Sequence, residues 1–248
     1  MAKVVRIENL TKAFGSIQAL DGVDMTIDVD ETRAIIGPNG AGKTTLFSII
    51  SGALSPSTGR IYHKGDDITG MSHHAVASSG IVKTYQINNL FWELSVLENV
   101  RIAAQTRERL YDFTTDYRNL EDTNERCHEI LEQVGLDDKV DALVDTLPYG
   151  DQRKLEIGIA MATDPSVLLL DEPTAGMEPG ETDTILEIVN DLSADEEAGI
   201  VITEHDIDVI LKVADLITVL HQGEVIAEGT AEEITSNERV QRVYLGEQ

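Results

Sequence analysis

The nine residues GPNGAGKTT, from Gly37 to Thr45, constrain the fold of this chain more than any other stretch. They match the pattern G-x-x-x-x-G-K-[ST] in full, follow the apolar run RAIIG and precede the apolar run TTLFSIISG. A strand, a glycine-rich loop and a helix in this order form a phosphate cradle, because glycines let successive backbone N–H groups turn toward phosphate oxygens. We therefore expect an α/β fold with a phosphate-binding loop after one of its strands.

The loop also predicts which groups contact a bound nucleotide. Lys43 should reach the β- and γ-phosphates, and the Thr44 hydroxyl should ligate Mg²⁺. A dinucleotide-binding fold is disfavoured, because the glycines are spaced G-x-x-G-x-G and not G-x-G-x-x-G. The remaining loop contacts to ATP are expected from Gly37, Asn39, Gly40, Ala41, Gly42 and Thr45.

Two acidic residues end a second buried strand. Asp171 and Glu172 follow the apolar run VLLL, and ligands of open α/β sheets bind at the carboxyl ends of strands. Asp171 can hold Mg²⁺ through water, since Mg²⁺ keeps much of its hydration shell, and Glu172 can orient or deprotonate an attacking water. A lone Asp-Glu pair is more often two solvated acids, but the intact phosphate loop favours the functional interpretation.

Two further polar residues should emerge at the same edge of the sheet. His205 follows GIVIT as Glu172 follows VLLL, and Gln86 ends the strand GIVKTYQ. An isolated histidine is more often structural, but this one is expected beside the phosphates. Gln86 alone would be weak support, although a neutral amide can contact both metal and water. We take both as candidate catalytic residues, and Gln86 also as a candidate metal ligand.

The charge of the chain is strongly negative. Asp and Glu total 45 against 19 Lys and Arg, which gives a formal net charge of −26. Nucleic acid is not expected as a partner, because its phosphates need a basic face. The acids are spread along the chain and not gathered in a tail, which is typical of a hydrated carboxylate surface in a salt-rich cytoplasm.

No segment has the length or composition of a membrane span or of a secretory signal. Apolar runs stay short of the roughly 18–20 residues that cross a bilayer. The first residues, MAKVVRIENL, lack the apolar region of a signal peptide. A protein without its own membrane anchor is therefore expected.

The order of periodic segments predicts an α/β core interrupted by helices. Residues 107–125 are polar and aperiodic and look like a surface insertion, whereas Cys127 is expected to pack on a buried helix face with Ile130, Leu131 and Val134. The helical pattern runs from about 95 to 163, and later helices are expected at 180–193 and 206–213. Strands are expected at 3–8, 23–28, 32–36, 59–63, 81–85, 166–172, 199–205, 215–220 and 224–228.

In this order the motifs resemble those of the nucleotide-binding subunits of ABC transporters, over nearly the whole chain. GPNGAGKTT is similar to the family's Walker A motif, TYQ to its Q-loop, VLLLDE to its Walker B motif and His205 to its switch histidine. Phe14, in LTKAFGSIQAL, matches the aromatic residue that stacks on adenine.

The resemblance implies a P-loop NTPase of the ABC-ATPase fold. This fold has a mixed sheet core, an antiparallel β subdomain and an inserted helical subdomain. The single nucleotide-binding domain would span residues 1–248, with the core and β subdomain at about 1–94 and 164–248 and the helical subdomain at about 95–163.

The stretch LPYGDQRKLEIG, residues 147–158, starts a helix with a proline and a glycine. The first N–H groups of a helix have no partner within it and can bind an anion. The stretch resembles the family's signature motif, L-S-G-G-Q, which caps the γ-phosphate held by the other subunit of a head-to-tail dimer. The resemblance implies that Tyr149, Gly150 and Asp151 contact the partner's ATP, although Pro148, Tyr149 and Asp151 depart from the consensus and Glu178 stands where the family mostly has Asp.

PYGDQRKLEI is similar to the Y-G-Q-Q-R version of the branched-chain amino-acid importers, and the tail RVYLGEQ favours the longer of their two ATPase subunits. This implies a subunit that hydrolyses ATP to ADP and phosphate, with Mg²⁺, to drive solute uptake at the cytoplasmic face of the membrane. Its partners would be membrane permease subunits, a second ABC ATPase subunit (a copy of itself or a shorter paralogue) and an extracytoplasmic solute-binding protein. The alternative is a soluble ABC ATPase that is not coupled to transport.

Overall fold

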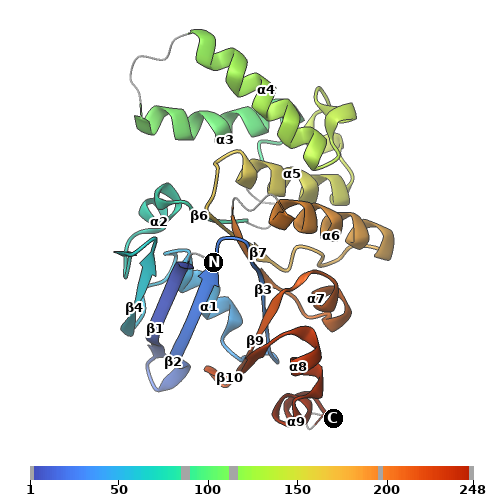
Figure 1. Cartoon of the computed structure of the whole chain (residues 1–248). Coiled ribbons are helices and arrows are strands. Elements are labelled where there is room, and N and C mark those ends of the chain that lie inside the picture. The colour runs from blue at the N-terminus through green and yellow to red at the C-terminus, as the bar shows by residue number, and fades with distance from the viewer. Residues whose placement is uncertain (1–2, 85–89, 112–116, 195–197, 246–248) are drawn as a thin grey trace.

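The computed structural model describes residues 3–84, 90–111, 117–194 and 198–245, and the strands of these residues form two sheets (Figure 1). The smaller sheet is antiparallel, with the order β2-β1-β4-β5. The strands expected at 3–8 and 23–28 were predicted too short, because pairing between β1 and β2 keeps residues 9–14 extended up to the turn between Phe14 and Ile17. The strands are β1 (Lys3–Phe14), β2 (Ile17–Asp28), β4 (Thr58–His63) and β5 (Asp66–Asp67).

The larger sheet has the order β10-β9-β3-β8-β7-β6 and is parallel except for β10, which pairs antiparallel with β9. Every residue of β3 and β8 is buried, as expected for central parallel strands that are covered on both faces. The strands are β3 (Thr32–Ile36), β6 (Ile81–Lys83), β7 (Val167–Asp171), β8 (Gly199–Thr203), β9 (Leu216–His221) and β10 (Glu224–Gly229).

Helices cover both faces of the larger sheet. The buried residues of α1 (Lys43–Ile50) pack with those of the smaller sheet in one hydrophobic cluster. The buried residues of α6 (Pro179–Ala194) and α7 (Ile207–Val213) belong to a second cluster, which covers the opposite face. The remaining helices of this part are α2 (His73–Ser79), α8 (Ala231–Ser236) and α9 (Glu238–Leu245).

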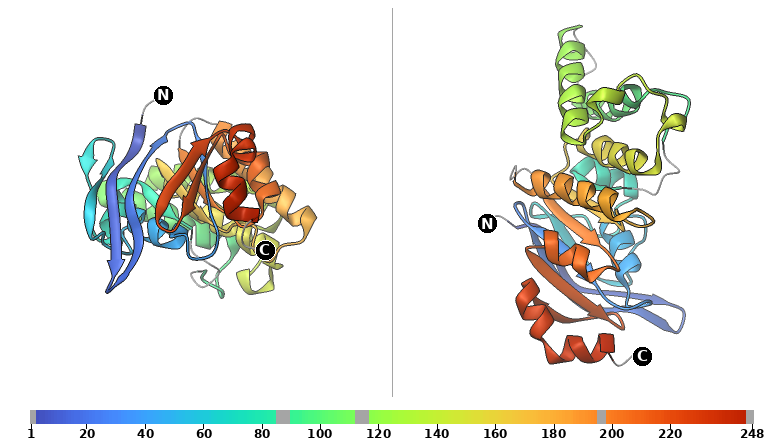
Figure 2. Two further views of the ribbon diagram at one scale, coloured as in Figure 1. Left: turned by 90° about the horizontal axis from the view of Figure 1, so that it is seen from below. Right: turned by 90° about the vertical axis from the view of Figure 1, so that its right-hand side faces the viewer.

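Three further helices form a layer toward one end of the molecule (Figure 1, and the right-hand view of Figure 2). They are α3 (Val96–Tyr111), α4 (Tyr117–Gln133) and α5 (Tyr149–Met161), with the short 3-10 helices η1 (Asp137–Lys139) and η2 (Val144–Thr146) between α4 and α5. Cys127 lies fully buried in the core of this layer with Ile130, Leu131 and Val134, as predicted. The predicted fold class, a mixed sheet with an antiparallel sheet and inserted helices, is confirmed.

The stretch 107–125, expected as a surface insertion in the helical part, is helical over most of its length. Residues 107–111 continue α3, and residues 117–125 belong to α4. A helix that has been nucleated gains one hydrogen bond for each residue added, so it can extend beyond the residues that carry its apolar face. The polar composition of this stretch therefore did not predict where the helices end.

Candidate functional site

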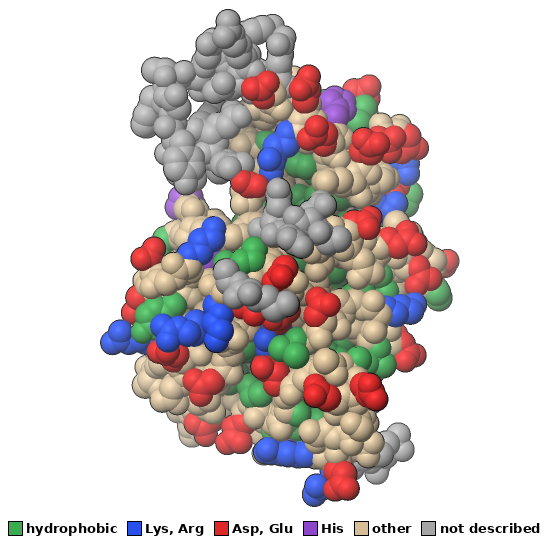
Figure 3. All heavy atoms as spheres, in the orientation of Figure 1, with side chains coloured by type: hydrophobic (Ala, Val, Ile, Leu, Met, Phe, Trp, Pro, Cys, Tyr) green, Lys and Arg blue, Asp and Glu red, His purple; other side chains and the backbone are tan. Residues whose placement is uncertain are grey.

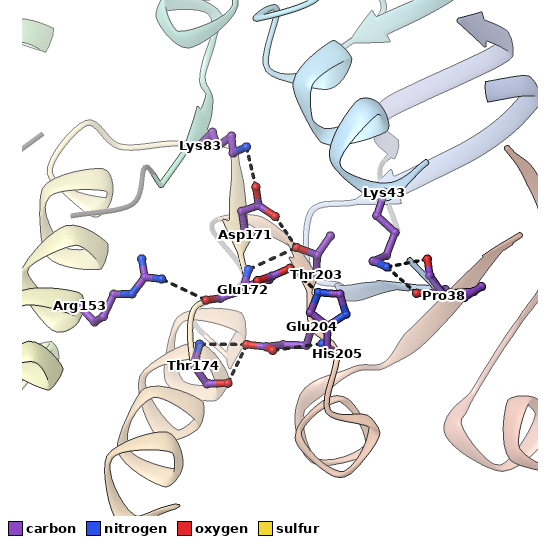
Figure 4. Close-up of polar contacts among 11 residues, drawn as sticks. Pro38, Lys43, Lys83, Arg153, Asp171, Glu172, Thr174, Thr203, Glu204 and His205 are labelled. Carbon is purple, nitrogen blue, oxygen red and sulfur yellow. Dashed lines mark hydrogen bonds and ion pairs between the residues drawn. The ribbon is translucent and has the colours of Figure 1, made fainter. Parts of the chain in front are cut away.

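The carboxyl ends of β3, β6, β7 and β8 meet at one edge of the larger sheet, because these strands are parallel neighbours. Asp171 and Thr203 are the last residues of β7 and β8 and lie opposite each other in the register. Figure 4 shows these two side chains in contact, with Lys43 of the phosphate loop and Arg153 of α5 on opposite sides of them. Segments far apart in the chain therefore meet at this edge, as their apolar runs had predicted.

The phosphate loop owes its shape to two close backbone approaches. Gly42 has a φ of 109°, and a Cβ atom on it would lie 2.6 Å from the carbonyl oxygen of Ala19. A Cβ atom on Gly37 would lie 2.2 Å from the carbonyl oxygen of Leu220. Only glycine fits both positions, and α1 then begins directly at Lys43. The first N–H groups of α1, which lack partners within the helix, therefore face the loop.

A cavity of about 400 Å³ lies against this loop. It brings together residues from the ends of β1, β7 and β8, and Ala19, which was not predicted, also lines it. Phe14 at its rim is 49% exposed, and the Lys12 ammonium lies over its ring, 5.1 Å from the ring centre. A second cavity of about 270 Å³, lined in part by Arg126 and Leu168, contains none of the predicted site residues. The predicted residues that line the first cavity are Phe14, Asn39, Gly40, Ala41, Gly42, Lys43, Thr44, Thr45, Glu172 and His205.

The Lys43 ammonium is held by carbonyl groups of the loop. Its Nζ atom donates hydrogen bonds to the carbonyl oxygens of Gly37 and Pro38, the latter at 3.2 Å. Burial lowers the pKa of Lys43, while the carboxylates of Glu172 and Asp171 act in the opposite direction. A phosphate group would offer this ammonium an anionic acceptor, which makes a stronger hydrogen bond than a neutral carbonyl.

The Asp171 carboxylate lies between two donors. Lys83 Nζ donates to it at 2.8 Å and Thr203 Oγ1 at 2.7 Å (Figure 4). Lys83, at the end of β6, was not predicted as a site residue, although a lysine within a short apolar strand was a signal that could have marked it.

The predicted Mg²⁺ ligands fit that ion only together with a nucleotide. No group of three or more His, Cys, Asp or Glu that could hold a metal by itself occurs in the described part of the chain. Mg²⁺, however, prefers oxygen ligands and is often held by one or two protein groups, waters and substrate phosphates. Thr44 and Asp171 supply such oxygens. The third predicted ligand, Gln86, lies outside the described residues.

The Glu172 backbone has the left-handed conformation, with a φ of 49°, which is uncommon for a residue other than glycine. Its N–H donates to the Thr203 carbonyl oxygen at 3.0 Å, and Arg153 Nη2 donates to its carbonyl oxygen at 3.2 Å. Its side chain points toward His205, with Oε1 and Nε2 2.6 Å apart. Strained backbone of this kind is concentrated at functional sites, so the geometry places Glu172 and His205 as a pair at the cavity.

Glu204 forms hydrogen bonds that hold the backbone near this pair, and it was not predicted from the sequence. It is buried, and its Oε1 atom accepts from the backbone N–H of Thr174 at 2.9 Å and from the Thr174 hydroxyl at 2.7 Å. The contact ties the segment after Glu172 to the segment that carries His205 (Figure 4). The only signal in the sequence was an acidic residue next to the histidine at the end of a buried strand.

The start of α5 faces residues of its own chain. The Tyr149 hydroxyl donates to the Ala175 carbonyl oxygen at 2.9 Å, and a Cβ atom on Gly150 would lie 2.7 Å from the Glu181 carboxylate. Burial would raise the pKa of Asp151, but ion pairs with Lys139 at 2.5 Å and Lys154 at 3.3 Å lower it overall. The predicted contact of Tyr149, Gly150 and Asp151 with a partner's ATP stays a prediction.

Comparison with known families agrees with this geometry. The family described as "ABC transporter" matches residues 20–175, which include the phosphate loop, Asp171 and Glu172. The chain belongs to the ABC transporter family. Residues 224–248 of this ABC protein also match the family described as "Branched-chain amino acid ATP-binding cassette transporter".

Similar proteins of known role cover almost the whole chain. The branched-chain amino acid transport ATP-binding protein BraF of Pseudomonas aeruginosa is 36% identical in an alignment of 251 positions that covers 98% of this chain and 98% of that protein. The lipopolysaccharide export system ATP-binding protein LptB of Haemophilus influenzae is 34% identical over 245 residues, 99% of this chain and 98% of that protein.

Solved structures of ATP-binding cassettes superpose closely on this ABC protein. The ADP conformation of MJ1267 has a TM-score of 0.86 and 32% identity, and covers 99% of this chain and 100% of its own. The dimeric post-hydrolysis state of MJ0796, bound to ADP and Pi, has a TM-score of 0.77 and 26% identity. It covers 92% of this chain and 98% of its own. The chain is an ATP-binding subunit that hydrolyses ATP, and the predicted fold and enzyme class are confirmed. No helix of its described residues is long and apolar enough to cross a membrane.

Proposed function

We propose that this ABC protein is the ATPase subunit of an importer for branched-chain amino acids or a related small solute. Overall sequence identity does not distinguish this cargo from others, because BraF is 36% identical to this chain and the export protein LptB is 34% identical. The observation that carries the proposal is the match of residues 224–248, which comprise β10, α8 and α9, to the branched-chain cassette family.

Residues at and beside the cavity have distinct roles in the proposed reaction. Phe14 stacks on the adenine, Lys43 and the loop N–H groups bind the phosphates, and Thr44 and Asp171 would hold Mg²⁺, with Gln86 as a further ligand. The ion, when bound, neutralises charge that develops on the transferred phosphoryl group. Glu172 takes the proton of the attacking water, and His205, 2.6 Å from its carboxylate, keeps that carboxylate turned into the cavity.

The reaction is proposed to take place in a head-to-tail dimer. The start of α5, at Tyr149, Gly150 and Asp151, would cap the γ-phosphate bound by the other subunit, which is either a second copy or a shorter paralogue. The helical subdomain at about 95–163 would carry this cap. The dimer would sit on permease subunits at the cytoplasmic face of the membrane, and the permease would receive solute from an extracytoplasmic binding protein.

The role of Glu172 is tested with Glu172→Gln. We expect unchanged ATP affinity, a turnover lowered about 10²- to 10⁴-fold, as for the loss of a positioned general base, and a stable dimer in Mg-ATP. Calorimetry, phosphate release and size exclusion measure the three quantities. A variant that hydrolyses ATP at the wild-type rate would place the base elsewhere.

The cargo is tested in cells. Uptake of labelled leucine should be lost when the gene is deleted, restored by the wild-type chain and not restored by Glu172→Gln. Pull-down of the wild-type chain should bring permease subunits with it. ATPase activity without a permease partner and without any effect on leucine uptake would support the soluble alternative.

A further inference from the structure

The backbone of Glu172 is anchored from two different elements. On one side its N–H donates to the carbonyl oxygen of Thr203 on β8 at 3.0 Å. On the other side its carbonyl oxygen accepts from Arg153 on α5 at 3.2 Å (Figure 4). Because the φ of Glu172 is 49°, this residue adopts a conformation that only its surroundings can enforce. The direction of its carboxylate therefore depends on both anchors.

Arg153 has little freedom to do anything else. It is 4% exposed, and its Nη1 atom donates to Glu156 Oε2 at 2.8 Å, one turn further along the helix. Its Nε atom is buried without a partner among the described residues. A buried guanidinium needs its pairing because an unpaired buried charge is strongly unfavourable. Glu156 thus fixes the fork of Arg153, and the second arm of the fork reaches Glu172.

A second contact joins the same two segments. The Tyr149 hydroxyl, in the first turn of α5, donates to the Ala175 carbonyl oxygen at 2.9 Å. The first two turns of α5 therefore hold two carbonyl oxygens of the segment 172–175. A small shift of α5 relative to the sheet would move both contacts together.

We propose that Arg153 is a positioning residue, which sets the direction of the Glu172 carboxylate according to the position of α5 in the same chain. The inference rests on the proposed function, in which Glu172 is the base and the start of α5 caps the partner's ATP. Arg153 therefore acts on the site of its own subunit, whereas the start of the same helix serves the site of the partner.

The first test is Arg153→Lys. The single ammonium group of the introduced lysine can pair with Glu156 but cannot also reach the Glu172 carbonyl group. We expect kcat to fall by up to about 10²-fold, the effect of a small misplacement of a catalytic group, with ATP affinity and KM unchanged. In the background of Glu172→Gln, the change should not affect dimer formation in Mg-ATP.

One matched variant separates positioning from a general effect of replacing an arginine. Arg126→Lys alters another arginine of the helical layer, which pairs with Asp164 at 3.1 Å and does not contact Glu172, and should be near wild type. Equal losses in both variants, or a raised KM in Arg153→Lys alone, would overturn the inference.

The second test asks which site Arg153 serves, with heteromers isolated through two different tags. A heteromer of Arg153→Lys and Glu172→Gln subunits has one lesion in each site if Arg153 acts on its own subunit's base, and should be nearly inactive. The matched heteromer of Gly150→Asp and Glu172→Gln has both lesions in one site, because Gly150 serves the partner's ATP. It should keep the activity of a heteromer that consists of one wild-type and one Glu172→Gln subunit.

The outcomes distinguish the inference from the proposed function. Equal activity of both heteromers would mean that Arg153 acts on the partner's site, which overturns the inference and leaves the head-to-tail dimer intact. An inactive Gly150→Asp heteromer, beside an active wild-type and Glu172→Gln heteromer, would overturn the head-to-tail arrangement and the inference with it.

Discussion

At the scale of single residues, Lys43 carries the clearest electrostatic role. Among the described residues that line the cavity it supplies the one permanent positive charge. Lys43→Ala should weaken ATP binding about 10- to 100-fold, because hydrogen bonds to charged groups contribute about 1.5–3 kcal/mol each. Isothermal calorimetry measures the affinity. Lys212→Ala, which removes the same charge from an exposed ion pair with Asp183, should leave the affinity unchanged, and an equal loss in both variants would contradict the assignment.

His63 gives the fold a pH dependence of its own. It is buried, its Nε2 atom lies 2.8 Å from Ser166 Oγ, and burial lowers its pKa from 6.5 to about 4. The folded chain therefore keeps His63 neutral while the unfolded chain takes up a proton, so stability is lost as pH falls from about 6.5 to about 4. At pH 5 the loss should be about 2 kcal/mol.

The variant His63→Gln tests this dependence, because glutamine can bond to Ser166 but does not titrate in this range. The fall in Tm between pH 7 and pH 5 should be smaller in this variant than in the wild type. The exposed His74, changed to Gln, controls for loss of a histidine from the surface. A parallel fall in all three proteins would show that other groups cause the pH dependence.

At the scale of secondary structure, the start of α5 is unusual because its N-cap residue is Pro148, without a side-chain capping bond. A proline has neither a hydroxyl nor an N–H to offer an anion. The backbone N–H groups from Tyr149 onward and the helix dipole must then supply the attraction, about 0.3–2 kcal/mol. Pro148→Ala should therefore have a mild effect on ATP-driven dimerisation, and Gly150→Asp should abolish it without loss of ATP binding to the monomer.

Gly150→Ala separates charge from space in this prediction. A Cβ atom at position 150 would approach the Glu181 carboxylate to 2.7 Å, but that carboxylate ends a flexible side chain and can move. Gly150→Ala should thus be milder than Gly150→Asp when ATPase rate is measured against protein concentration. If the two are equally damaging, contact with Glu181 and not repulsion of phosphate explains the loss.

At the scale of the whole molecule, repulsion among carboxylates opposes folding. The formal net charge is −26, and Figure 3 shows Asp and Glu side chains spread over the face in view and not collected in one patch. The Debye length falls from about 30 Å at 0.01 M salt to about 3 Å at 1 M. Tm should therefore rise with KCl between about 0.05 and about 2 M. A flat Tm over this range would refute adaptation to salt without affecting the proposed transport function.

The sequence predicted those parts of the site that depend on local chemistry or on the order of strands in the sheet. The glycine spacing between Gly37 and Gly42 encodes the phosphate loop, and parallel strands place Asp171, Glu172 and His205 at one edge. The left-handed conformation of Glu172 could not be predicted, because no turn residue marks it. The ends of the two helices within 107–125 were also not predicted, because helix extension needs no apolar pattern once a helix has started.

The sequence by itself determined the order of strands and helices, the phosphate loop and the identity of the acids at the strand ends, since each depends on neighbours within a few residues. Only the tertiary structure decided which side chains meet. Lys83 and Asp171 are 88 positions apart, and Arg153 and Glu172 are 19 apart on different elements. The physical reason is that such pairs depend on how the helical layer packs on the sheet, and a periodic pattern states which face of an element is buried but not what it contacts.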